Sequence, residues 1–151
     1  MMINENITSI KGLFHIELKS SDGSIIDTYT NHNLVVNGGK ALLAHSLVGS
    51  DIDNKKISKF GVGDSIAVSS GDMIGLQGTN IFKKVIVGYE FPVYNQAKIN
   101  FEVGLTEANG IDIKEFGLFS ADGTLFNRVT WNKNVLKSSS FAFSGYFLIS
   151  F

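Results

Sequence analysis

Residues 97–105 read AKINFEVGL, and they carry the clearest periodic pattern in the chain. Apolar side chains at positions 99, 101, 103 and 105 alternate with polar or small residues at 98, 100, 102 and 104. Successive side chains of a β-strand point to opposite faces, so this alternation is typical of a strand with one buried face. Such strands belong to antiparallel sheets that have one face in the core.

Strand-like segments lie on both sides of this stretch. They are rich in Phe, Ile, Val and Tyr, and they are bounded by Gly, Asn, Asp and Ser, which is typical of strands joined by turns. The expected strands are residues 12–19, 25–29, 31–36, 57–62, 81–89, 97–105, 114–119, 124–131 and 141–151, with 31–36 either a short strand or an extended approach.

One segment has helical spacing instead. Residues 40–48 (KALLAHSLV) place Leu42, Leu43 and Leu47 on one side of a helix of about three turns. Gly49 follows directly, at the position where a left-handed residue commonly ends a helix.

Two turns share a Ser-x-Asp-Gly sequence, at residues 20–23 and 120–123. Ser and Asp side chains can bond turn amides, and Gly tolerates a positive φ. We therefore expect Gly23 and Gly123 to be turn glycines in the left-handed region. The similarity of the two hairpin sequences is explained more simply by this shared turn chemistry than by a duplication.

These elements predict a mainly β protein, an antiparallel β-sandwich of about eight strands with one short α-helix. Residues 1–151 are expected to form a single domain, with 1–9 as a flexible N-terminal segment. The periodicity assigns the core to Phe14, Ile16, Leu18, Leu43, Leu47, Phe60, Phe101, Val103, Leu118, Trp131, Phe147 and Ile149.

The composition limits the possible partners. Thirteen basic and fourteen acidic side chains give a net charge of −1, so phosphate neutralisation and nucleic-acid binding have little support. No window approaches the ~20 apolar residues of a membrane span, and we expect no membrane insertion. The chain has no cysteine, which is compatible with folding in a cytosol.

The histidines give no sign of a metal site. His15, His32 and His45 lie in different expected elements, and none has the spacing of a zinc-binding motif. We expect no metal and no cofactor.

The acidic residues and the single arginine also have ordinary explanations. Glu107, Asp112 and Glu115 could supply a catalytic carboxylate pair, but acids so close in sequence usually flank turns. No nucleophile motif is present, so we expect the protein not to be an enzyme. Arg128 should lie opposite Phe116, either solvated with its stem over apolar surface or stacked on the ring.

Two segments are candidates for protein contacts. Residues 63–80 form the longest irregular stretch, yet they carry several large apolar side chains among Gly and Ser, which indicates ordering against a partner. The final strand has aromatics that we expect on both faces, so its second face should be covered. The candidate interaction residues are Ile66, Val68, Met73, Ile74, Leu76, Tyr146 and Phe151.

Three segments in this order resemble a known group of proteins. They are residues 32–40 (HNLVVNGGK) with the Leu-rich helix that follows, residues 60–64 (FGVGD), and residues 107–119 (EANGIDIKEFGLF) with 122–128 (DGTLFNR). Together they resemble the β-rich modules near the start of bacteriophage tail-fibre and tail-collar proteins, and some small virion proteins. The resemblance spans roughly residues 10–151.

The resemblance implies a virion structural protein that is assembled in the host cytoplasm. It would act as a fibre, collar or baseplate-associated adaptor, as a homo-oligomer among other virion structural proteins. The alternative is a carbohydrate-binding β-sandwich for host-surface recognition, in which Trp131, Tyr29, Tyr89 or Tyr94 stacks on sugar rings.

Overall fold

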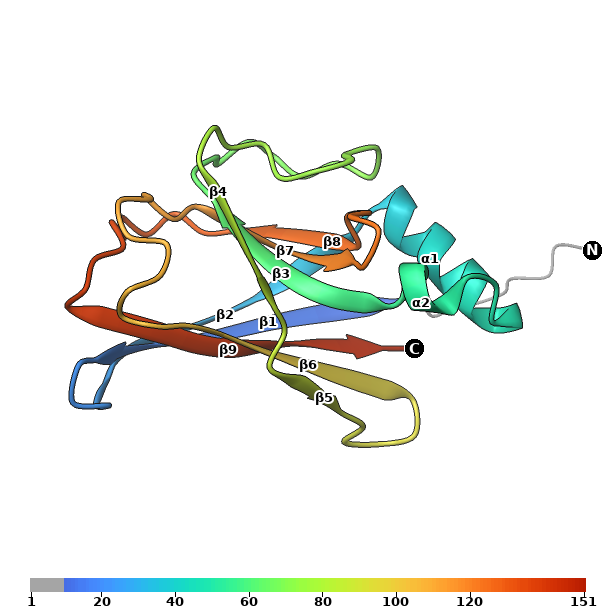
Figure 1. Cartoon of the computed structure of the whole chain (residues 1–151), viewed down its shortest axis with the longest axis horizontal. Helices are drawn as coiled ribbons and strands as arrows, with labels where there is room; N and C mark the ends of the chain where they lie inside the picture. Colours follow the sequence, from blue (N-terminus) through green and yellow to red (C-terminus); the bar gives the residue numbers. More distant parts are fainter. Residues whose placement is uncertain (1–9) are drawn as a thin grey trace, which may run out of the picture.

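Nine antiparallel strands and two helices make up residues 10–151, which are the residues that the computed structural model describes (Figure 1). Residues 1–9, expected to be a flexible segment, lie outside this described part. The strands are β1 Lys11–Ser20, β2 Ile25–Val35, β3 Ile57–Gly63, β4 Ile81–Val85, β5 Gly88–Glu90, β6 Gln96–Val103, β7 Glu115–Ser120, β8 Asn127–Thr130 and β9 Phe141–Ser150, and the helices are α1 Asn37–Val48 and α2 Ile52–Lys55.

The strands form one curled sheet in the order β4-β3-β7-β8-β2-β1-β9-β6-β5. The segment expected as one strand, 81–89, is split between the two ends of this sheet. The Ile86 amide donates to the Ser58 carbonyl of β3 (3.1 Å), and the next amide, of Val87, donates to the Asn100 carbonyl of β6 (2.9 Å). This segment therefore connects the two ends of the sheet, which curls into two facing layers around the core and agrees closely with the expected sandwich.

Aromatic rings fill the space between the layers. The Phe14 ring of β1 lies 4.6 Å from Phe116 of β7 and 5.8 Å from Phe101 of β6, measured between ring centroids. All three side chains are buried. Ring contacts of this kind add to the free energy gained from burying apolar area. Ten of the twelve expected core residues are buried: Phe14, Ile16, Leu18, Phe60, Phe101, Val103, Leu118, Trp131, Phe147 and Ile149.

The helix lies where the sequence predicted it, but the residues that it buries are nearer its N-terminus than expected. α1 packs on the body through Gly39 and Leu42. A Cβ on Gly39 would lie 2.1 Å from the Phe126 carbonyl oxygen, so only glycine permits this close approach. The helix then runs off the end of the body (Figure 1), which leaves Leu43 partly buried and Leu47 85% exposed. The prediction that Leu47 belongs to the core was wrong.

Both Ser-x-Asp-Gly turns have the expected conformation. Gly23 has φ +87° and Gly123 has φ +90°, and Gly49 ends α1 with φ +64°. In each turn the first Ser accepts the Gly amide at 3.0 Å and donates its own amide to the residue after Gly. The same sequence therefore forms the same hydrogen bonds at both places, and the turn prediction is confirmed.

Candidate interaction surface

Residues 64–80, between β3 and β4, run above β7 and β8 in Figure 1. They contain no helix or strand, yet they are tied to the rest of the molecule along most of their length. The sequence predicted that this loop becomes ordered against a partner. The contacts below show what holds it.

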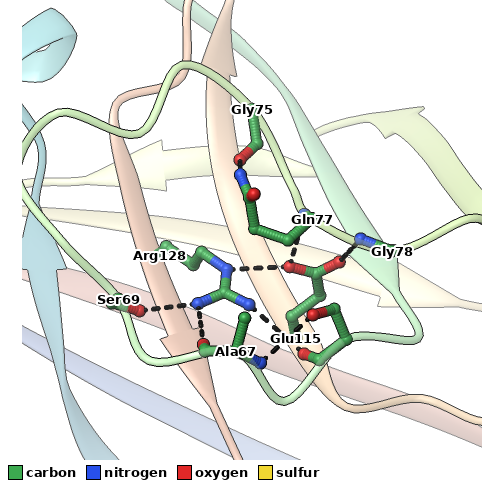
Figure 2. A network of polar contacts seen from close by, with 8 residues as sticks. Ala67, Ser69, Gly75, Gln77, Gly78, Glu115 and Arg128 are labelled. Atoms are coloured by element: carbon green, nitrogen blue, oxygen red, sulfur yellow. Dashed lines mark hydrogen bonds and ion pairs between the residues drawn. The ribbon is translucent and has the colours of Figure 1, made fainter.

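The main anchor is a buried ion pair between Glu115 of β7 and Arg128 of β8 (Figure 2). The Arg128 Nε donates to Glu115 Oε2 at 2.7 Å, and both side chains are 0% exposed. The rest of the guanidinium bonds the loop. Nη1 donates to the Ala67 carbonyl (2.6 Å) and the Ser69 hydroxyl (2.9 Å), and Nη2 donates to the Ser65 carbonyl (3.2 Å).

The carboxylate of Glu115 bonds the far end of the same loop. Oε2 accepts the Gln77 amide at 2.9 Å, and Oε1 accepts the Gly78 amide at 2.6 Å. A buried charge is costly unless it is paired and fully hydrogen-bonded. Here the two charges neutralise each other, and loop groups complete the hydrogen bonds that the pair alone would leave unmade. The pair and the loop therefore stabilise each other.

A shift of strand register places Arg128 on the face of the sheet opposite the main core, where the loop covers it. Near the hairpin turn Phe119 pairs with Leu125, but farther along Phe116 pairs with Val129, which is one residue out of step. Between them the Leu118 amide donates to the side-chain oxygen of Asn127. A slip of one residue moves a side chain to the opposite face. The expectations that Arg128 is solvated or stacked opposite Phe116 were therefore both wrong.

Other contacts fasten the ends and the middle of the loop. The Asp64 carboxylate accepts the main-chain amide (3.2 Å) and the side-chain amide (2.9 Å) of Asn80, which closes the base of the loop. The Asn37 amide, at the start of α1, donates to the Gly71 carbonyl at 2.7 Å. Leu76 is buried in a small apolar cluster with Val36, Phe119 and Leu125.

Three of the five candidate residues in the loop have exposed side chains. Ile66 is 67% exposed, Val68 88% and Ile74 91%, and we call these three side chains the loop face. Leu76 instead belongs to the protein's own core, and Met73 packs partly against the same cluster. The apolar character of those two residues is therefore explained by the fold, while that of the loop face is not.

The final strand lies in the middle of the sheet, with most of its aromatic side chains on one face. β9 lies between β1 and β6, so both of its edges are already paired. Phe143 and Phe147 are buried, and Phe141 packs on the core from the same side. Tyr146 is the exception on the outer face, where His15 stacks on it at 5.1 Å and the Lys98 ammonium lies 4.4 Å from the ring centre. Aromatic side chains therefore lie on both faces of β9 as expected, although the outer face carries only Tyr146.

Two of the candidate interaction residues, Tyr146 and Phe151, lie at the C-terminal end of the chain. Phe151 is half exposed, and its amide donates to the Asn95 carbonyl at 3.0 Å. Tyr146 and Phe151 thus remain partly accessible, but the structure does not bring either of them into the loop face.

The three neighbouring acids are kept apart, each with its own base. The Lys84 ammonium lies 2.7 Å from the Glu107 carboxylate and lowers its pKa. Asp112 lies 3.7 Å from Lys114, and Glu115 pairs with Arg128.

Among residues 10–151, no three His, Cys, Asp or Glu side chains come together in a way that could hold a metal ion. In the same range, no helix has both the length and the apolar character needed to cross a bilayer.

The aromatic residues considered for sugar stacking have different exposures. Trp131 is buried, with its indole N–H donating to the Ile113 carbonyl at 2.5 Å, and Tyr29 packs edge-on against it. Tyr89 and Tyr94 remain open, and Tyr94 is fully exposed. Tyr89 lies 5.7 Å from the exposed Phe91, between ring centroids, near the β5–β6 turn.

Comparisons of the chain with protein-family models, curated proteins and solved structures gave no match. The resemblance noted in the sequence has no counterpart in these comparisons.

The sequence pattern missed the two residues that hold the loop. Glu115 precedes an apolar run and Arg128 interrupts another, each within an expected strand. A single arginine in an otherwise apolar strand is a signal for a buried pair, because long charged side chains are seldom buried without a partner. The partner itself could not be identified without the register of β7 and β8.

Proposed function

We propose that this protein is a non-enzymatic structural subunit that assembles with other protein chains, and that the loop face is one of its contact surfaces. The observation that carries the proposal is the anchoring of Ile66, Val68 and Ile74. These three large apolar side chains are exposed to solvent. The loop that carries them is held by the Glu115–Arg128 ion pair, by the bonds of the Asp64 carboxylate to Asn80 and by the buried Leu76.

Anchoring of this kind favours binding. A loop that is already ordered loses less conformational entropy when it meets a partner, so more of the interaction free energy appears as affinity. Burying the ion pair costs desolvation free energy, so its main effect is to fix the loop in a single conformation.

We further propose that the assembly is a bacteriophage virion, put together in the host cytoplasm. This finer proposal rests on the ordered sequence motifs that resemble tail-fibre and tail-collar modules. The partners would be other virion structural proteins, with the chain present in several copies at a fibre, collar or baseplate.

The test compares two exposed valines. Val68→Asp places a charge in the loop face, whereas Val85→Asp places the same charge on β4, where the valine is 62% exposed. Each variant is supplied to phage particles that lack the wild-type chain, and its copies per particle are counted by mass spectrometry. Val68→Asp should be lost from particles and Val85→Asp retained, with both proteins folded by circular dichroism.

Equal incorporation of the two variants would refute the loop face as an assembly surface. Absence of the wild-type chain from purified particles would refute the virion role itself. Single substitutions suit this test better than removal of residues 66–76, because that deletion would also remove the buried Leu76 and the partners of Arg128.

A glycan-binding role is the second candidate, and the exposed aromatics near the β5–β6 turn favour it. Tyr94 is fully exposed and Tyr89 is 67% exposed, so both rings are free to stack on sugar. The burial of Trp131 removes the largest ring from this set. Binding of the isolated protein on a glycan array, lost in Tyr94→Ala, would support this role; no binding to any glycan would exclude it for the glycans tested.

A further inference from the structure

The strand edges of this sheet are protected to very different degrees. Edge strands invite pairing with other chains, and proteins commonly blunt them with lysines or by making them short. β4 carries Lys83 and Lys84, and β5 has only three residues. β2 is different. Within residues 10–151 it pairs with β8 only at Leu34 and Val35, so residues 27–33 (DTYTNHN) have a free edge with no lysine, arginine or proline.

The direction of the free amides follows from the neighbouring pairs. The Val36 amide points to the β8 side, because it donates to the Phe126 carbonyl at 3.1 Å. Amides alternate in direction along a strand, so those of Thr28, Thr30 and His32 point to the same side. The Asp27 and Asn31 side chains accept the Thr28 and His32 amides, each at 2.8 Å.

Space for another strand lies beside this edge. A surface hollow of about 700 Å³ is bordered by Tyr29 of β2 and by Thr130, Trp131 and Asn132 across from it. Paired strands lie about 4.7–4.9 Å apart. The edge is therefore bordered by open space at Tyr29, while the Lys133 side chain reaches across it to Asp27 at one end of the stretch.

We infer that two copies of this chain pair along β2, antiparallel, with the two-fold axis at Thr30. The free stretch 27–33 is centred on Thr30, so this register uses all of it. Thr30 meets its own copy, and Thr28 lies opposite His32, so the two amides that side chains cap in the single chain exchange bonds across the axis. Such an arrangement is the self-complementary contact that two-fold symmetry requires.

The charges in this register allow the pairing. Asp27 is the only residue of the stretch with a full charge, and it lies opposite Asn33 of the other copy. Its charge is matched within its own chain by an ion pair with Lys133. No like charges therefore meet across the axis, which would otherwise disfavour the pair.

The β2 contact would be one contact between copies of this chain in the proposed assembly, and it rests on the proposed function only in assuming that the chain assembles. Of the loop face, only Ile66 borders the hollow beside this edge, and Val68, which the assembly test changes, does not line it. The two ideas can therefore fail separately.

The first experiment removes a single amide. Thr30→Pro lacks the N–H that would cross the axis, and proline is tolerated where a strand N–H points away from the sheet. Thr30→Val is the matched control, since it also loses the hydroxyl that bonds His15 but keeps the amide. In sedimentation of the full chain, wild type and Thr30→Val should be dimers and Thr30→Pro a folded monomer.

The second experiment does not depend on the fold of the proline variant. The chain has no cysteine, so a single introduced one reports only on contact between copies. Hydrogen-bonded residues opposite each other have Cα atoms about 5.5 Å apart, within the range of a disulfide. Thr30→Cys should give a covalent dimer on mild oxidation, and Lys83→Cys, exposed on β4, should not.

The outcomes separate the two proposals. A monomeric wild-type chain, or equal cross-linking of the two cysteine variants, would overturn the β2 contact and leave the loop face untouched. A Val68→Asp protein that still cross-links through Thr30→Cys but does not enter particles would support both. If Thr30→Pro fails to fold, the cross-linking result decides.

Discussion

The β1–β2 turn and the loop at residues 64–80 are both rich in Ser, Gly and Asp, but they are held in opposite ways. The turn is closed by its own residues: the Ser20 hydroxyl donates to the Asp22 carboxylate, which also accepts the Ser24 amide at 2.9 Å. The loop depends on Glu115 and Arg128, which are distant in sequence and come from two other strands.

This difference separates local from long-range order. A turn that makes its own hydrogen bonds keeps its shape wherever the sequence is placed. A loop whose amides and carbonyls are satisfied by a buried ion pair keeps its shape only while that pair is intact. The order of the loop face therefore depends on the Glu115–Arg128 pair. Substitutions in this pair should change the conformation of the loop and should not change that of the two Ser-x-Asp-Gly turns.

The largest effect should come from breaking the ion pair. Arg128→Met leaves the Glu115 carboxylate buried without its partner, which should cost about 3–5 kcal/mol of unfolding free energy. Denaturant unfolding measures the loss. A change below about 1 kcal/mol would mean that water or another group replaces the guanidinium.

A core substitution of similar cost provides the control. Phe101 is buried between Phe14 and Phe60, with ring centroids 5.8 and 4.9 Å away. Phe101→Ala should also cost about 3–5 kcal/mol. It should leave the loop contacts intact in the folded state, so hydrogen exchange below the unfolding transition should separate the two variants.

Replacing both charges should separate stability from loop order. A buried pair exchanged for apolar residues is often neutral or stabilising, so Glu115→Leu with Arg128→Met should be more stable than Arg128→Met alone. The loop would still lose the groups that bond Ala67, Gln77 and Gly78. Denaturant melts of the single and double variants test this, and a double variant no more stable than Arg128→Met would contradict it, because the lost Glu115–loop bonds would then cost at least as much as the unpaired charge.

The turn glycines should give smaller and equal effects. A non-glycine residue in the left-handed region costs about 1–2 kcal/mol, and nothing lies within 4 Å of a Cβ built on Gly23 or Gly123. Gly23→Val and Gly123→Val should each lose about that much in a denaturant melt, clearly more than Ala121→Val. A cost at Gly123 no greater than at Ala121 would contradict the turn assignment.

The smallest effect should be on acid stability. Hydrogen bonds from the Ser20 and Ser24 side chains lower the pKa of Asp22 to about 2, and bonds from Ser120 and then Lys55 lower that of Asp122. A carboxylate with a lowered pKa stabilises the fold fully above its unfolded value, about 4, and loses this contribution as the pH falls below it.

Asp22→Asn should therefore flatten the fall of the melting temperature between about pH 4 and pH 2. The comparison is a pair of thermal melts across that range, wild type beside variant. Parallel curves for the two proteins would show that the Asp22 bonds contribute nothing to folding.

The sequence anticipated what depends on nearby residues. The alternation at 97–105, the Leu-rich helix and both Ser-x-Asp-Gly turns were correctly assigned, because spacing and turn chemistry act within a few residues. The split of 81–89 into β4 and β5 could not be foreseen, since it depends on which strands lie at the two ends of the sheet.

The candidate site divides in the same way. Ile66, Val68 and Ile74 could be selected as unusual apolar residues in a polar loop, and they are exposed. Leu76 could not be told from them, because its burial depends on Phe119 and Leu125 from another hairpin. Arg128 was misplaced because the register shifts by one residue between the Phe119–Leu125 and Phe116–Val129 pairs, where the Leu118 amide donates to the Asn127 side chain.

Hydrogen exchange at the Gln77 and Gly78 amides tests the central claim, that Glu115 and Arg128 hold the loop in one conformation. Both amides donate to the Glu115 carboxylate, while the Gly23 and Gly123 amides donate within their own turns. In the wild-type protein the two loop amides should exchange slowly. In the double variant Glu115→Leu, Arg128→Met they should exchange at the rate of an open chain, with the two turn glycines unchanged. Fast exchange of the loop amides in the wild type, or slow exchange that survives in the double variant, would contradict the account.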